Sequence, residues 1–120
     1  MTKRIARILV AVAATHCLGG ALGSAIAQDH RHHHDFAPDV DAFHAVLAPV
    51  WHARPGKART QDACAKADRM EALAKDIRSK DASALQTSIT ALKATCKGNK
   101  LADVDGALHD VHEAFHRLID

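Results

Sequence analysis

Apolar residues between Phe36 and Ile119 recur at intervals of three and four, and this spacing constrains the fold more than any other feature of the sequence. Such intervals place side chains on one face of an α-helix. Short polar segments divide the pattern into successive runs, and no run alternates at period two as a half-buried strand would. The runs are Phe36, Val40, Phe43, Leu47 and Val50; Ala63, Ala67, Met70, Ala74 and Ile77; Leu85, Ile89, Leu92 and Cys96; and Leu101, Val104, Leu108, Val111, Phe115 and Ile119. We therefore predict an all-α protein, an antiparallel up-and-down four-helix bundle over residues 36–120.

Residues suited to helix ends lie between the apolar runs. The first helix is expected from about Pro38 to about Trp51, with a bend at Pro49. Pro55-Gly56 should close the connection that follows it. The expected N-caps of the second and third helices are Thr60 and Asp81, Gly98 should follow the end of the third, and Asn99 should open the fourth.

Residues 1–27 have the features of a cleaved secretory signal peptide. Lys3, Arg4 and Arg7 precede an apolar run, and Ala25-Ile26-Ala27 has the small-x-small pattern of a cleavage site. Polar residues and glycines interrupt the run before the roughly 20 apolar residues that a membrane span needs. We therefore expect a periplasmic or secreted protein with no membrane segment after cleavage.

Removal of the signal peptide changes the charge of the chain. The segment holds three of the 16 basic residues and none of the 14 acidic ones, so the formal net charge falls from +2 to −1. A nearly neutral chain gives no reason to expect a nucleic-acid partner. Histidine is the over-represented residue, because nine of the ten histidines remain in the 93 residues after Ala27.

Two cysteines, Cys64 and Cys96, remain after cleavage, in a compartment where disulfides persist. If the second and third helices form a hairpin that turns near Lys80, each cysteine lies 16 residues from the turn. Both then sit about 24 Å along the hairpin, at the same level. We expect a disulfide that stabilises the fold by about 3–4 kcal/mol on the chain-entropy estimate.

One flank of the fourth helix carries Asp105, His109, His112 and His116. At 100 degrees per residue, His112 lies about 60 degrees from the centre of the apolar face, His116 about 100 and His109 about 120. His112 and His116 are spaced i and i+4, so both imidazoles can bind one metal ion from the helix face. The alternative is a solvated helix flank without any ligand.

The antiparallel first helix places further candidates beside this flank. His44 should lie level with His112 or His116 and supply a third ligand, whereas His52 falls almost opposite the core. Glu113 lies between the paired histidines, but the order is HExxxH rather than the HExxH of zinc proteases. No other catalytic motif is visible, so we expect a non-enzyme.

A histidine-rich tail, residues 28–35, precedes the bundle. It reads "QDHRHHHD" and contributes His30, His32, His33 and His34. With no apolar face to bury, it should be flexible and bind metal ions weakly, as a secondary site independent of the bundle. Alternatively, it is only a solvated linker.

A periplasmic four-helix bundle that ends in Ala114-Phe115-His116 resembles the soluble b-type cytochromes. The resemblance covers the architecture and this short C-terminal match. It implies non-covalent haem b and electron transfer, with His116 as one ligand. Because the first helix has no Met, His44 would have to be the second, and covalent haem is excluded since the chain has no CxxCH.

The sequence thus favours a periplasmic protein that buffers, senses or delivers a transition metal, through His44, His109, His112 and His116. Copper is favoured, and zinc, nickel and cobalt remain alternatives, because histidine sites rank these ions mainly by intrinsic affinity. Binding should weaken as pH falls through the histidine pKa of about 6.5, since only neutral imidazole coordinates. The site can lie within one bundle or across a homodimer. A metal-free structural or partner-binding bundle is the other alternative.

Overall fold

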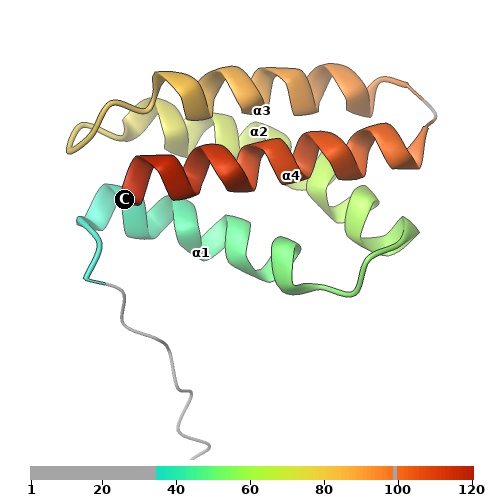
Figure 1. Ribbon diagram of the computed structural model, residues 1–120, viewed down its shortest axis with the longest axis horizontal. Coiled ribbons are helices and arrows are strands. Elements are labelled where there is room, and N and C mark those ends of the chain that lie inside the picture. The colour runs from blue at the N-terminus through green and yellow to red at the C-terminus, as the bar shows by residue number, and fades with distance from the viewer. Residues whose placement is uncertain (1–34, 99) are drawn as a thin grey trace, which may run out of the picture. The chain divides into compact units, whose positions relative to one another are not determined.

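The computed structural model describes residues 35–98 and 100–120, which form four α-helices joined by short connections. The helices are α1 (Pro38–His52), α2 (Lys57–Asp76), α3 (Ser83–Cys96) and α4 (Leu101–Ile119). Successive helices run in opposite directions (Figure 1). The predicted all-α four-helix bundle is confirmed, and the described residues contain no strand.

The core consists of the predicted apolar faces. The interior positions of each run are buried, from Val40 in α1 to Phe115 in α4, whereas Leu101, at the start of α4, is 46% exposed. Among the described residues, the backbones of α1 and α3 do not come close to each other, while those of α2 and α4 do so across the bundle. Ala63, Ala67 and Ala74 are half of the buried residues of α2, and small side chains let two helix backbones approach closely. The α1 and α4 helices pack least closely of the pairs in contact.

The α2–α3 hairpin is held covalently. Cys64 and Cys96 form the predicted disulfide, with their Cα atoms 5.6 Å apart. On the outside of the same hairpin, Lys93 pairs with Asp68 and Glu71. These two carboxylates raise the pKa of Lys93 above its usual value.

The start of α1 is tied to the loop between α2 and α3 by Asp39. Its carboxylate accepts hydrogen bonds from the backbone N–H groups of Arg78 (2.7 Å) and Ser79 (2.9 Å), and from the Ser79 hydroxyl (2.6 Å). These hydrogen bonds, the Ser79 hydroxyl foremost, hold the pKa of Asp39 far below its ordinary value.

The N-caps of α2 and α3 differ from those that the sequence predicts. The prediction that Thr60 caps the second helix is wrong, because α2 begins at Lys57 after Gly56, whose φ of 142° reverses the chain. The Thr60 hydroxyl instead donates to the Lys57 carbonyl inside the helix (2.9 Å). The predicted N-cap Asp81 is also wrong by one residue, because the N-cap of α3 is Ala82, although the Asp81 carboxylate accepts the Ser83 N–H (3.0 Å). The α1 helix continues through Pro49 to His52.

The segment predicted to be a signal peptide (residues 1–27), the tail histidines His30, His32, His33 and His34, and Asn99 lie outside the described residues. Among the helices that are described, none is both long enough and apolar enough to cross a membrane.

Candidate functional site in the α1–α4 groove

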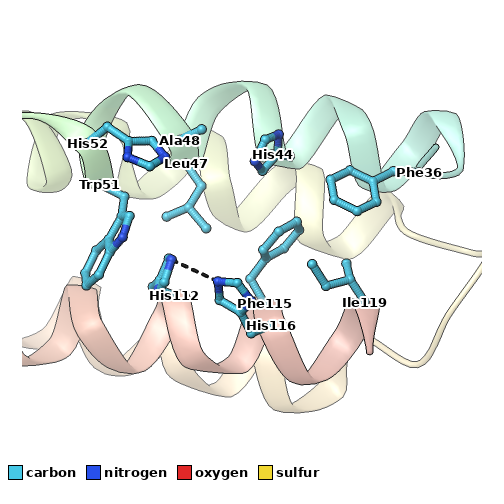
Figure 2. A pocket seen from close by; sticks show the side chains of 10 residues that line it. All are labelled: Phe36, His44, Leu47, Ala48, Trp51, His52, His112, Phe115, His116 and Ile119. Carbon is cyan, nitrogen blue, oxygen red and sulfur yellow. Dashed lines mark hydrogen bonds between the residues drawn. The ribbon is translucent and has the colours of Figure 1, made fainter. Parts of the chain in front are cut away.

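A groove of about 240 Å³ lies between α1 and α4, where these helices pack least closely. Histidines and aromatic side chains supply most of its wall (Figure 2). We call it the α1–α4 groove, and it is lined by Phe36, His44, Leu47, Ala48, Trp51, His52, His112, Phe115, His116 and Ile119. A groove with apolar walls and a few polar nitrogens is typical of a small ligand site.

His112 and His116 meet on the α4 side of the groove. Their Nε2 atoms are 3.1 Å apart, and the two rings are inclined at 70° (Figure 2). In the metal-free protein, one nitrogen can donate a hydrogen and the other accept it, so both rings can be neutral. The i and i+4 spacing therefore brings two ring nitrogens to one point, as the sequence predicts.

The separation of these nitrogens also suits a shared metal ion. Zinc holds imidazole nitrogens at about 2.0–2.1 Å, and ions of similar size need similar distances. Two nitrogens bound to one such ion are about 2.9 Å apart at a right angle and about 3.3 Å apart at a tetrahedral angle. The observed 3.1 Å lies between these values. The separation of the two nitrogens is therefore compatible with one ion bound at both of them.

His112 is the more enclosed of the pair, as expected from its position nearest the apolar centre of α4. Its side chain is 19% exposed, and its ring stacks on Trp51 with a centroid distance of 3.8 Å and an interplanar angle of 12°. Burial, followed by the nearby His116, lowers the pKa of His112 below its usual value. This shift in pKa favours the neutral ring, which is the form that binds metal.

The second nitrogen of His112, Nδ1, is buried, and no described residue forms a hydrogen bond with it. The nearest acceptor is Oε1 of Glu113, at 3.7 Å. Histidines that bind metal usually donate their other N–H to a carboxylate or carbonyl, which fixes the tautomer and the ring orientation. A small movement of Glu113 would supply this contact and leave Nε2 free to coordinate.

Arg59 of α2 fixes the position of Trp51. Its guanidinium donates to the Trp51 carbonyl (3.2 Å), pairs with Asp105 of α4, and lies 5.2 Å from the centre of the Trp51 ring. The Arg59 side chain is only 9% exposed, whereas the side chain of its partner Asp105 is 45% exposed. Arg59 thus holds Trp51 in place from α2, and the Trp51 ring in turn stacks on His112.

His44 lies level with the paired histidines but does not join them. Its ring stacks on Phe115 at 5.4 Å and meets Phe36 edge-on at 5.3 Å. Phe115 thus separates His44 from His116, although all of these residues line the groove. The register prediction is consistent with this placement, but helix angles do not reveal that an aromatic ring fills the space between the two histidines.

The other predicted ligands lie around this centre. His52 is exposed and lines the groove from α1, while His109 is exposed outside the lining residues, with its ring 5.8 Å from Trp51. Asp105 contacts Arg59, and Glu113 lies beside His112. Over residues 35–98 and 100–120, no group of three or more His, Cys, Asp or Glu side chains is arranged to hold a metal ion.

Sequence reasoning missed Trp51, Arg59 and Phe36 as parts of the site. Trp51 is the only tryptophan in the chain and lies one residue before His52, which was a detectable signal. Arg59 carries no such signal, because its role depends on a contact with Asp105, 46 residues away.

A porphyrin does not fit between His44 and His116 in this conformation. Phe115 contacts both rings, and the groove is smaller than the roughly 300–1,000 Å³ of pockets for drug-sized ligands. The haem alternative would require α1 and α4 to separate.

No protein-family model, curated protein or solved structure matches this chain. Interpretation of the site therefore depends on its own geometry.

Proposed function

We propose that this protein is an exported, non-catalytic metal-binding protein, whose bundle holds one transition-metal ion at His112 and His116. The observation that carries the proposal is the 3.1 Å separation of the two Nε2 atoms. Copper(II) is the favoured ion, because nitrogen sites bind it most tightly among the divalent first-row metals. Zinc and nickel are the alternatives, and the role would be buffering, sensing or delivery.

The surroundings of the pair support this function. Trp51 and Phe115 shield one side of the histidines, and the lowered pKa of His112 reduces competition from protons. His116 is exposed, so an ion can enter without unfolding the bundle. An accessible pair with open coordination positions suits uptake and release better than permanent structural binding, in which the ligand set is closed.

Trp51 provides the test, because a copper ion bound to the ring stacked on it should quench its fluorescence. The protein should be expressed from its whole sequence and purified without an affinity tag, then titrated with copper(II) chloride. We expect quenching that saturates at one ion per chain. The double substitution His112→Gln, His116→Gln should abolish the tight phase.

His109→Gln is the matched control. His109 lies on α4 and also near Trp51, but outside the groove, so its replacement should leave the tight phase within a few-fold of the original. Unchanged quenching and affinity in the double variant would overturn the proposed function. The same titration with zinc, followed by calorimetry, ranks the two ions.

A further inference from the structure

The two ring nitrogens of His112 have different surroundings. Nε2 lies 3.1 Å from Nε2 of His116, which lines the same groove (Figure 2). Nδ1 is buried, and no described residue forms a hydrogen bond with it. Oε1 of Glu113 lies 3.7 Å from Nδ1, which is too far for a hydrogen bond but within a small rotation of one. The second nitrogen of this candidate metal ligand thus lies beside a carboxylate.

Glu113 favours one of the two neutral forms of the His112 ring. A neutral imidazole carries a hydrogen on one nitrogen and a lone pair on the other. An ionised carboxylate can only accept hydrogen bonds, so it attracts an Nδ1–H group and repels a lone pair on Nδ1. The His112 ring should therefore carry its hydrogen on Nδ1 and its lone pair on Nε2, which is the atom that meets His116.

The contact between the two histidines is consistent with this form. One Nε2 must donate the hydrogen that the other accepts, because two lone pairs or two N–H groups at 3.1 Å would repel each other. With the lone pair on Nε2 of His112, the donor is the Nε2–H of His116. His116 is exposed, so its ring can exchange this hydrogen for one on its own Nδ1 through water when an ion enters. The more enclosed ring of His112 then needs no change of form.

We propose that Glu113 is a positioning residue for the metal site: it accepts the Nδ1–H of His112 and so keeps the lone pair of that ring on Nε2, ready for the ion. The Glu113 side chain is 48% exposed, so it can rotate towards Nδ1 without disturbing the core. A carboxylate on the second nitrogen of a ligand histidine fixes the ring and makes it a better ligand. This inference rests on the proposed function and adds to it the residue that sets the form of one ligand.

The first readout is nuclear magnetic resonance of the ring nitrogens in the whole, metal-free protein. We expect the hydrogen of His112 on Nδ1 and that of His116 on Nε2, with signals assigned through the single variants His112→Gln and His116→Gln. Glu113→Ala should shift His112 towards the Nε2–H form. Glu113→Gln keeps a side-chain oxygen that can accept the same hydrogen, so it should lie closer to the original protein. Asp110→Ala is the matched control, because Asp110 is an exposed carboxylate on the same helix.

The second readout is titration of the same variants with copper(II). We expect Glu113→Ala to weaken the tight site about 10–100-fold, as loss of an outer carboxylate does in other metal sites, and Asp110→Ala to stay within a few-fold of the original. An unchanged His112 form or unchanged affinity in Glu113→Ala would overturn this inference, and so would an equal loss in Asp110→Ala, because net charge alone would then account for it. Abolition of tight binding by the double substitution His112→Gln, His116→Gln would still support the proposed function in those cases. An unaffected double variant would overturn the function itself.

Discussion

The α2–α3 hairpin and the α1–α4 groove are built from different residues and perform different tasks. The hairpin is closed by the Cys64–Cys96 disulfide, and half of the buried residues of α2 are alanines. The groove is lined by aromatic rings and histidines, and its two helices pack least closely. The hairpin is thus held by a covalent link, whereas the α1–α4 side of the bundle presents polar ring nitrogens to a groove.

Removal of the disulfide is expected to have the largest effect on stability. The bridge closes a loop over a sequence separation of 32, worth about 3–4 kcal/mol on the chain-entropy estimate. The double substitution Cys64→Ser, Cys96→Ser should therefore lower the melting temperature by roughly 15 °C or more for a domain of this size. Urea unfolding measures the loss. A change below about 1 kcal/mol would show that the hairpin does not depend on its covalent link.

The substitution Asp105→Ala should have the next largest effect, because it removes the ion pair between Arg59 of α2 and Asp105 of α4. It leaves the Arg59 guanidinium, which is largely buried, without its carboxylate. We expect a loss of about 1–2 kcal/mol and a shift in Trp51 fluorescence, since Arg59 also contacts Trp51. Asp110→Ala is the control, because Asp110 is an exposed carboxylate on the same helix. Equal losses in the two variants would contradict the role given to Arg59.

Asp39 should make the stability depend on pH. Its pKa is depressed in the folded state, so its contribution is complete above the ordinary carboxyl value of about 3.9 and is lost as pH falls toward the folded value. Asp39→Asn should therefore be less stable than the original protein at pH 7, and the difference should shrink below about pH 4. Urea midpoints at several pH values measure this. A difference that is independent of pH would exclude the carboxylate as its cause.

The smallest effect is expected for His116→Gln. His116 is exposed, and substitutions of exposed residues usually change stability by no more than about 0.5 kcal/mol. The variant should unfold like the original protein when metal is absent but lose the tight copper site. Marked destabilisation of the metal-free protein would mean that His116 supports the packing of the bundle and is not only a metal ligand.

The sequence predicts how far along the bundle axis a residue lies better than it predicts which side chains meet across the bundle. Counting residues from the turn near Lys80 places Cys64 opposite Cys96, and the disulfide confirms the count. The same kind of argument places His44 level with His116, where Phe115 separates the two rings. Helical periodicity fixes height and approximate angle, but the rotamers of large rings decide which side chains meet.

Contacts between distant residues were the part that could not be predicted. The i and i+4 spacing of His112 and His116 identifies the pair because both residues belong to one helix. The stack of Trp51 on His112 and the contact of Arg59 with Asp105 join different helices, and many other partners would satisfy the same apolar pattern. The error at Thr60 is a local one, because helix-forming residues before it extend α2 back to Lys57.

The most direct test of the central claim is anomalous diffraction at the copper edge from crystals of the whole protein grown with one equivalent of copper(II). We predict a single strong peak about 2.0–2.1 Å from both His112 Nε2 and His116 Nε2. Copper bound elsewhere, with the paired nitrogens still in contact with each other, would contradict the account.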